Sequence, residues 1–215
     1  MRIGVLGTGR VAAVLGTRWA TRGHSIVFGS RTPAGEKARQ LAERAGPSAS
    51  VGTLLDAVAT AEVVLLATPY AAAPELLASL GELGDRVLID CSNPLKPDLS
   101  GLVVEGGPSA AERIAGWARG GRVVKAFNVA STATMAQPLY DGQAASMFYC
   151  GDDRDAKTIV RQLVADLDFE PVDAGPLRCA SYLESLAMLY IHLAVREGWG
   201  SHCAFRMMRR DPPPK

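Results

Sequence analysis

Two glycines and an alanine near the start of the chain have the residue types and spacing that bind a dinucleotide. Gly7, Gly9 and Ala12 form a G-x-G-x-x-A motif. Gly7 permits a sharp turn, Gly9 has no Cβ and lets a pyrophosphate approach the backbone, and Ala12 is small enough for a helix to pack on a strand. The free N–H groups and the dipole of such a helix favour a bound anion. The residues expected to bind the pyrophosphate are therefore Gly7, Thr8, Gly9, Arg10 and Val11.

The residues after the second apolar run predict which dinucleotide binds. NAD-binding proteins usually carry an acidic residue there, which accepts hydrogen bonds from the ribose 2′-OH. This chain instead has Ser30 and Arg31, and its first acidic residue after them is Glu36. A hydroxyl and a guanidinium bind a 2′-phosphate through charge-assisted hydrogen bonds, whereas a carboxylate would repel it. We therefore predict NADP(H) as the cofactor, with Lys37 adding a positive charge; the alternative for Arg31 is a solvated surface arginine.

The motif needs a strand before it and a helix after it, and the sequence supplies both. An apolar run at residues 2–6 precedes the glycines, Val11, Leu15 and Trp19 follow at helical spacing, and a second apolar run covers residues 25–29. Later apolar runs, at residues 63–67, 87–90 and 122–127, alternate with helical patterns. Such continuous apolar strands are typical of a parallel sheet buried on both faces. We predict an α/β fold of Rossmann type, a doubly wound parallel sheet with a small C-terminal α/β lobe.

Polar residues follow three of the later strands, at the point where each strand ends. Thr68 and Pro69 follow the first, Asn93 the second and Asn128 the third. The carboxyl ends of the strands of a doubly wound sheet open onto one crevice, where ligands bind. We therefore expect these four residues to border the nicotinamide.

No side chain near the predicted crevice is marked as a general acid. Lys125 and Asn128 are the candidates for a catalytic role. Lys125 lies within an apolar strand, so it either points to solvent or pairs with a cofactor group. Asp90 is better explained as a capping carboxylate for the turn that follows it. A flavin or deazaflavin accepts a hydride into its own ring and needs no protein acid, whereas a ketone or imine would gain from one.

Composition excludes several other classes of protein. The chain has 215 residues, 48% of them hydrophobic and 21% charged, with a formal net charge of +1. This balance favours neither nucleic acid nor a membrane as partner. The four cysteines form no C-x-x-C pair, and no Cys/His group has the spacing of a zinc site, so no metal is expected. With no signal peptide and no apolar run of membrane-spanning length, we expect a cytoplasmic protein.

We expect three regions along the chain. Residues 1–130 form the NADP-binding Rossmann domain. Residues 131–205 form a small lobe that supplies substrate and dimer contacts. Residues 206–215, which are basic and proline-rich, form a disordered tail.

Several stretches in this order resemble the NADP oxidoreductases that depend on the deazaflavin coenzyme F420. The matching stretches are Gly7-Thr8-Gly9, Gly23-His24, Val27-Phe28-Gly29-Ser30-Arg31, Ser109-Ala110-Ala111-Glu112, Cys150-Gly151-Asp152-Asp153, Asp173-Ala174-Gly175-Pro176-Leu177 and Leu183-Glu184. The resemblance implies a homodimer in which a hydride passes between NADP and a small-molecule acceptor, the deazaflavin, stacked against the nicotinamide.

One segment differs from that family. Val124-Lys125-Ala126-Phe127-Asn128 is similar to the cytosolic reductase domain of the six-transmembrane metalloreductases, which share the fold. The deazaflavin enzymes tend to have histidine where Asn128 stands, and an amide cannot serve as an acid. Alternative acceptors are therefore a flavin or a small imine or enone. A second alternative is a non-catalytic NADP-binding sensor or partner subunit.

Overall fold

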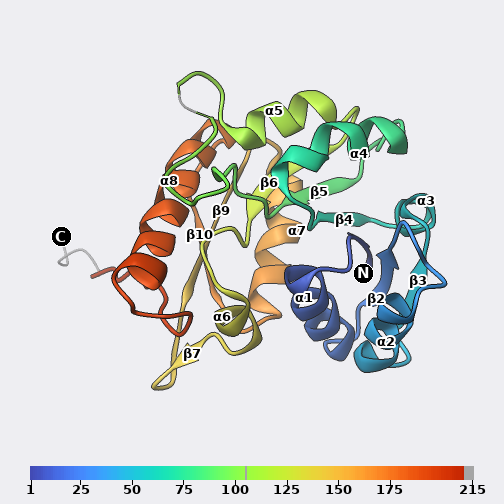
Figure 1. Cartoon of the computed structure of the whole chain (residues 1–215), viewed down its shortest axis with the longest axis horizontal. Coiled ribbons are helices and arrows are strands. Elements are labelled where there is room, and N and C mark those ends of the chain that lie inside the picture. Colours follow the sequence, from blue (N-terminus) through green and yellow to red (C-terminus); the bar gives the residue numbers. More distant parts are fainter. Residues whose placement is uncertain (105, 211–215) are drawn as a thin grey trace, which may run out of the picture.

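The computed structural model describes residues 1–104 and 106–210 and has a central sheet between two layers of helices (Figure 1). Within these residues the sheet contains eight strands. They are β1 (Arg2–Leu6), β2 (Ser25–Gly29), β3 (Ala49–Gly52), β4 (Val63–Leu66), β5 (Val87–Asp90), β6 (Arg122–Ala126), β9 (Ser146–Gly151) and β10 (Glu170–Asp173). A separate hairpin pairs β7 (Leu139–Tyr140) with β8 (Gln143–Ala144). The predicted Rossmann-type α/β fold is confirmed.

The strand order is β10-β9-β6-β5-β4-β1-β2-β3. From β3 to β6 all neighbours are parallel, and the order reverses at β1, where a doubly wound sheet binds its ligands. β9 pairs antiparallel with β6, and β10 runs parallel to β9. The C-terminal part of the chain thus adds two strands to the same sheet. These two strands run opposite to the strands from β3 to β6. The division into two domains near residue 130 stays a prediction.

Helices cover both faces of the sheet. One core cluster packs α1 (Arg10–Thr21), α2 (Glu36–Ala45), α6 (Thr132–Ala136) and α7 (Arg154–Ala165) against one face. The other packs α3 (Leu54–Ala59), α4 (Ala73–Leu80), α5 (Ala110–Trp117) and α8 (Ala180–Ile191) against the opposite face. The remaining short helices are the 3₁₀ helices η1 (Tyr70–Ala72) and η2 (Leu177–Cys179) and the π-helix η3 (His192–Arg196). None of the helices in the described part of the chain is both long and apolar enough to cross a membrane.

The sequence signals for the helix ends are seen in the structure. Thr53 with Asp56 and Ser109 with Glu112 form two capping boxes, a pairing that their spacing of three residues permits. α2 begins at Glu36, and α8 ends as an α-helix at Ile191, where the π-helical η3 continues it.

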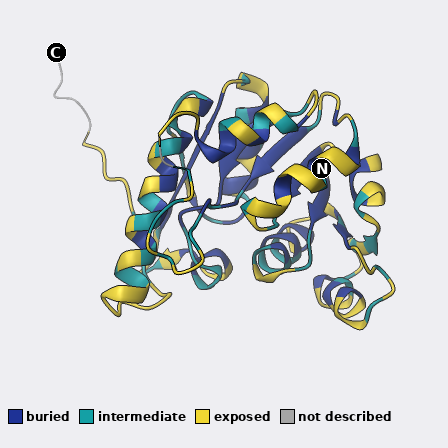
Figure 2. Cartoon of the chain, turned by 45° about the horizontal axis from the view of Figure 1, so that its top comes forward, coloured by how far each residue is buried: buried dark blue, intermediate teal, exposed yellow. Residues whose placement is uncertain are grey.

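The sheet is buried and the outer helix faces are exposed (Figure 2). α1 lies close to the sheet partly because Gly16 has no side chain: a Cβ there would lie 2.4 Å from Cε1 of Phe28. Ala12, the small residue of the motif, is fully buried on the same helix. Close helix–strand packing therefore depends on two small residues, only one of which belongs to the motif.

The C-terminal residues return to the sheet. The Ser146 N–H donates to the Phe205 carbonyl at 2.9 Å, and the Met207 N–H donates to the Ser146 hydroxyl at 2.9 Å. Arg206 donates to the Ala144 carbonyl at 2.9 Å. Residues 206 and 207 are therefore held in place, which differs from the tail expected to begin there, because their backbone and side chains find partners beside β9. Residues 211–215 of that expected tail lie outside the described residues.

Candidate functional site: a groove across the strand ends

The turn between β1 and α1 requires glycine at one position and leaves space above another. Gly7 has φ +123°, a conformation that other residues rarely adopt, and a Cβ there would lie 2.9 Å from the Ala67 carbonyl oxygen. A Cβ on Gly9 would meet nothing within 4 Å. Gly7 therefore shapes the turn, and Gly9 keeps the approach to the backbone open.

The start of α1 is free to receive an anion. Gly9 is its N-cap and supplies no side-chain hydrogen bond, and the first turn contains no acidic residue. The first N–H groups of a helix have no partner within it and carry a partial positive charge. These features fit the pyrophosphate of a dinucleotide.

A first cavity, of about 520 Å³, extends from this turn over the ends of β1 and β2. It is lined by Gly7, Thr8, Gly9, Gly29, Ser30, Arg31, Thr32, Leu54, Ala67, Thr68, Pro69, Ala72, Glu75, Leu76 and Ser79. Ser30 is largely buried, and its hydroxyl oxygen accepts the Thr32 N–H at 3.1 Å. The hydroxyl proton remains able to donate, and the exposed Arg31 adds a positive charge beside it. The two residues expected at a 2′-phosphate thus lie in one cavity.

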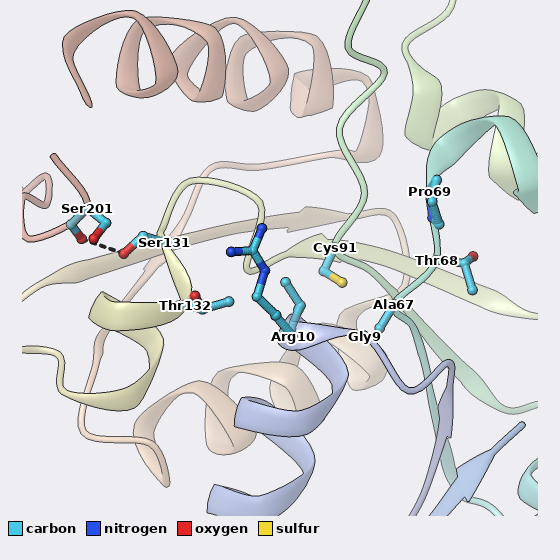
Figure 3. A pocket seen from close by; sticks show the side chains of 10 residues that line it. Gly9, Arg10, Ala67, Thr68, Pro69, Cys91, Ser131, Thr132 and Ser201 are labelled. Carbon is cyan, nitrogen blue, oxygen red and sulfur yellow. Dashed lines mark hydrogen bonds between the residues drawn. The ribbon is translucent and has the colours of Figure 1, made fainter. Parts of the chain in front are cut away.

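A second cavity, of about 480 Å³, lies on the other side of the glycine turn (Figure 3). Its lining consists of Gly9, Arg10, Val11, Ala67, Thr68, Pro69, Cys91, Ser131, Thr132 and Ser201. Arg10 extends between Thr132 and Cys91, and the Ser131 hydroxyl donates to the Ser201 carbonyl at 2.6 Å. Gly9, Ala67, Thr68 and Pro69 line both cavities, so the two form one groove.

Thr68 marks the junction of the two cavities. Its hydroxyl oxygen is buried and has no hydrogen-bond partner. Buried polar atoms are almost always partnered, so such an atom beside a groove suits a polar ligand. Thr68 and Pro69 therefore line the groove, and their place beside a nicotinamide stays a prediction.

Within the described residues, the lining of the second cavity contains no aspartate, glutamate, histidine, lysine or tyrosine. Its one thiol, Cys91, donates to the Leu66 carbonyl at 3.2 Å. Burial, assisted by the negative charge of Asp90 and partly opposed by Lys125, raises the pKa of Cys91 to about 12. This end of the groove therefore offers hydroxyls, a protonated thiol and a guanidinium, and no group that exchanges protons near neutral pH.

Lys125 does not reach the groove, which corrects its place among the catalytic candidates. Its side chain is fully buried, and Nζ lies 2.8 Å from the Asp90 carboxylate and 3.2 Å from the Glu184 carboxylate, and it donates to the Ser92 carbonyl at 3.0 Å. Burial alone would lower the pKa of Lys125, but the charges of Asp90 and Glu184 raise it overall. The ammonium therefore keeps its charge near neutral pH, and it is engaged by Asp90, Glu184 and the Ser92 carbonyl.

The carboxylates of this buried cluster have further partners. Glu184 accepts the N–H groups of Ala110 and Ala111 at the start of α5, each at 3.2 Å. Asp90 accepts the Ser92 N–H and hydroxyl at 2.9 and 2.7 Å, so it caps the turn as expected and also pairs with Lys125. The cluster joins β5, β6, α5 and α8 directly behind Cys91.

Asn93 and Asn128 lie behind the groove and do not line either cavity. The Asn128 amide donates to Asn93 Oδ1 and to the Leu183 carbonyl, both at 3.0 Å, and the Asn93 amide donates to the Asn128 carbonyl at 2.8 Å. This pairing holds the ends of β5 and β6 together, so both side chains are turned inward. Phe127, just before Asn128, has φ +63°, which is uncommon for a buried aromatic residue and turns the chain sharply after β6.

Sequence reasoning missed Cys91, Ser131, Thr132 and Ser201. Cys91 directly follows β5, so its position in the sequence could have predicted that it lies at the ligand-binding edge of the sheet. Ser131 caps α6 by accepting the Thr134 N–H at 3.0 Å, a spacing visible in the sequence. Ser201 carried no signal, because it reaches the cavity only through the return of the chain after α8. Lys37 lines neither cavity and instead borders a shallow depression across α1.

The chain is similar to several known proteins in sequence and in fold. The family model described as NADP oxidoreductase, coenzyme F420-dependent, matches residues 2–94. The F420-dependent NADP reductase of Methanothermobacter thermautotrophicus is 32% identical over 212 residues, which cover 91% of this chain and 90% of that protein. Metalloreductase STEAP3 of Rattus norvegicus is 30% identical over 187 residues and 87% of this chain, and the match spans only 36% of that protein.

A crystal structure from Arthrobacter sp. FB24 has the same fold over nearly its full length. That protein is provisionally described as an F420-dependent NADP reductase. It superimposes with a TM-score of 0.87 at 28% sequence identity, covering 97% of this chain and 100% of the other.

Proposed function

The chain belongs to the family of F420-dependent NADP oxidoreductases, and from this membership we propose that it transfers a hydride between NADP(H) and a deazaflavin or flavin-like acceptor. The family makes the chain an NADP-dependent oxidoreductase. The acceptor is the part that the proposal adds.

The first cavity and the glycine turn suit NADP(H) from its adenosine end to its nicotinamide. Ser30 and Arg31 would hold the 2′-phosphate in the first cavity, and the N–H groups at the start of α1 would hold the pyrophosphate above Gly9. Thr68 and Pro69 would border the nicotinamide where the two cavities meet. The nicotinamide supplies the hydride chemistry, and the protein supplies position and surroundings.

The second cavity carries the proposal for the acceptor. A carbonyl or imine that receives a hydride also needs a proton, which a positioned side chain usually delivers. The lining described above offers no such donor near neutral pH, since the Cys91 thiol has its pKa raised to about 12. An acceptor ring that takes the hydride and exchanges its proton with water suits this surface. The same observation disfavours a small imine or enone.

We also propose an oligomeric state, which rests on family membership, and a cellular location, which rests on composition. The family resemblance favours a homodimer. A cytoplasmic location fits four cysteines that are all unpaired.

The test is NADPH consumption by the purified protein with the deazaflavin coenzyme and with FMN as separate acceptors. We expect turnover with the deazaflavin coenzyme, with FMN as a slower substitute. An imine or enone that is reduced while both ring acceptors are inert would overturn the proposed acceptor. Tight NADPH binding with no turnover of any acceptor would favour the sensor or partner subunit instead.

A further inference from the structure

The end of the chain forms part of the wall of the second cavity. Residues 201–207, which we call the return segment, run back along α6 and β9. Ser201 lines the second cavity, as do Ser131 and Thr132 at the start of α6. Among the described residues that line the first cavity, none of these three is found. The contact between α6 and the return segment therefore bounds only one end of the groove.

Two side-chain hydroxyls at α6 hold the return segment. The Ser131 hydroxyl donates to the Ser201 carbonyl at 2.6 Å (Figure 3). The Thr134 hydroxyl donates to the Cys203 carbonyl at 3.1 Å. The next bond along the segment is a backbone bond, from β9 to the Phe205 carbonyl. The part of the segment that borders the cavity is therefore held by side chains rather than by a backbone ladder.

A tyrosine outside the cavity completes this arrangement. The Tyr140 hydroxyl on β7 lies 2.7 Å from the Thr134 hydroxyl. Thr134 has one hydroxyl proton, which goes to the Cys203 carbonyl because a carbonyl can only accept. Ser131, 3.2 Å from Thr134, uses its own proton in the shorter bond to Ser201. Tyr140 is therefore the donor to Thr134, and a hydroxyl that accepts one hydrogen bond donates a stronger one.

The geometry makes the return segment sensitive to the loss of one hydroxyl. Thr134 is only 1% exposed, and Tyr140 is half-buried. A buried polar group that loses its partner costs more free energy than the bond itself contributed. Neither Thr134 nor Tyr140 lines either cavity. They can therefore affect a ligand only through Ser131 and the return segment.

We propose that Tyr140 and Thr134 are positioning residues for the hydride acceptor, because they hold the return segment against α6 and so set the width of the second cavity. The proposal rests on the proposed function, which puts the acceptor in that cavity. Without the two hydroxyls the wall opens part of the time, and the population of the closed cavity falls. The apparent affinity for the acceptor falls by the same factor. The affinity for NADPH, which is assigned to the first cavity and the glycine turn, stays the same.

Tyr140→Phe tests the proposal because it removes one oxygen atom and keeps the ring. The readout is KM for the deazaflavin coenzyme, or for FMN if only FMN turns over. We expect this KM to rise about three- to tenfold, the effect of one lost hydrogen bond, and KM for NADPH to change less than about twofold. A rise of equal size in both KM values would mean general loosening of the protein and would overturn the proposal.

Variants of Thr134 test the same contact from its other side. Thr134→Val should raise KM for the hydride acceptor at least as much as Tyr140→Phe does. Thr134→Ser keeps the hydroxyl and should stay within about twofold of the wild type. In the double variant with Thr134→Val, Tyr140→Phe should add less than about twofold, because the hydroxyl that accepts its bond is already gone. Effects that multiply would show that Tyr140 acts by another route and would overturn its role.

Tyr149→Phe is the matched control. Tyr149 is a buried tyrosine on β9 that lines neither cavity and takes no part in the hydroxyl contacts at α6. The variant loses the same atom, and KM for the hydride acceptor should change less than about twofold. Equal effects of Tyr149→Phe and Tyr140→Phe would overturn the proposal, because the loss of any buried tyrosine hydroxyl would then be enough.

Hydrogen exchange separates this inference from the proposed function, because it needs no acceptor. The N–H groups of Ser146 and Met207 form bonds between β9 and the return segment. Peptides that contain these two amides should exchange about three- to tenfold faster in Tyr140→Phe, while the peptide that contains Gly7 and Gly9 stays unchanged. If no acceptor turns over, the proposed function fails, and faster exchange with unchanged NADPH affinity still supports the hold on the cavity wall. Unchanged exchange near Ser146 and Met207 would overturn the inference, whatever the outcome of the turnover assay.

Discussion

The ammonium of Lys125 on β6 lies 3.2 Å from the carboxylate of Glu184 on α8. Both side chains are buried, and Asp90 completes the cluster from β5. Removing two carboxylates and an ammonium from water is costly, and the cluster is tolerable only because nearly every group has a close partner. Cys91, which lines the second cavity, directly follows Asp90. The cluster therefore supports the wall of the groove without taking part in chemistry there.

Replacing Lys125 by methionine should destabilise the protein by about 3–5 kcal/mol, because it leaves two buried carboxylates without their counter-charge. The measurement is the free energy of unfolding in urea. Lys157→Met is the control, since Lys157 pairs with Asp173 at 2.9 Å nearer the surface. That change should cost about 1 kcal/mol or less. Equal losses for the two variants would contradict the structural importance of the buried cluster.

The stabilisation by Lys125 should also depend on pH in one direction. Its pKa in the folded protein is raised above the ordinary value of 10.5 by Asp90 and Glu184, which outweigh the effect of burial. Its contribution is therefore complete below pH 10.5 and is lost only as the pH rises through the folded-state pKa. The difference in unfolding free energy between wild type and Lys125→Met should be constant from about pH 7 to 10 and shrink above that range. If the difference in unfolding free energy grew with alkaline pH, the pKa of Lys125 in the folded protein would be lowered rather than raised.

Two glycine substitutions should separate folding from cofactor binding. Gly7→Ala introduces a Cβ 2.9 Å from the Ala67 carbonyl at a positive φ, and should cost about 1–3 kcal/mol of stability. Gly9→Val introduces its side chain into open space, so the melting temperature should change little. The valine would instead occupy the approach of the pyrophosphate and weaken NADPH binding by about tenfold or more. Thermal unfolding and NADPH titration of both variants check this contrast.

Arg31→Ala should weaken NADPH binding by about 1–3 kcal/mol, the cost of a lost charge-assisted hydrogen bond. NADH has no 2′-phosphate, so its dissociation constant should hardly change. Titration of both cofactors is the measurement, and Arg39→Ala is the control for loss of an exposed arginine outside the cavities. If Arg31→Ala weakened NADPH and NADH equally, the 2′-phosphate could not be the partner of Arg31.

The pH profile of turnover should be flat, because the described residues that line the second cavity include no aspartate, glutamate, histidine, lysine or tyrosine. With the deazaflavin coenzyme as acceptor, kcat/KM should stay level from about pH 6 to 9 apart from any titration of the acceptor itself. Cys91→Ala should lower the rate by less than about threefold, because the thiol is protonated and its pKa is about 12. If kcat/KM instead titrated with an enzyme pKa between about pH 6 and 9, and this titration disappeared in Cys91→Ala, the thiol would take part in the reaction.

Much of the N-terminal half of the fold could be predicted because its signals are local. The glycine turn, the strand before it, and the helix and strand after it all lie within residues 2–29. The direction of β9 could not be predicted, because an apolar run has no sign that tells a parallel from an antiparallel strand. The structure shows that β9 runs antiparallel to β6.

The groove itself was predicted less completely, for a physical reason. Lys125 could have faced solvent or a ligand, and it is directed into the core by Asp90 and Ser92 at the end of β5 together with Glu184 on α8. Asn128 follows a strand end, where ligands usually bind, but its amide is turned inward by Asn93 and the Leu183 carbonyl. Side-chain direction at a strand end is thus set by tertiary partners, which local spacing does not reveal.

The hydrogen bond between Ser131 and Ser201 joins two segments that are synthesised at different times. The two cavities of the groove are therefore completed one after the other. All lining residues of the first cavity precede Leu80, whereas the second cavity is closed only after Ser201 has left the ribosome and folded back. The end of the groove that we propose for the adenosine is therefore translated long before the end that we propose for the acceptor. A chain stopped after β6 would contain every residue of the first cavity but would lack Ser131, Thr132 and Ser201 of the second.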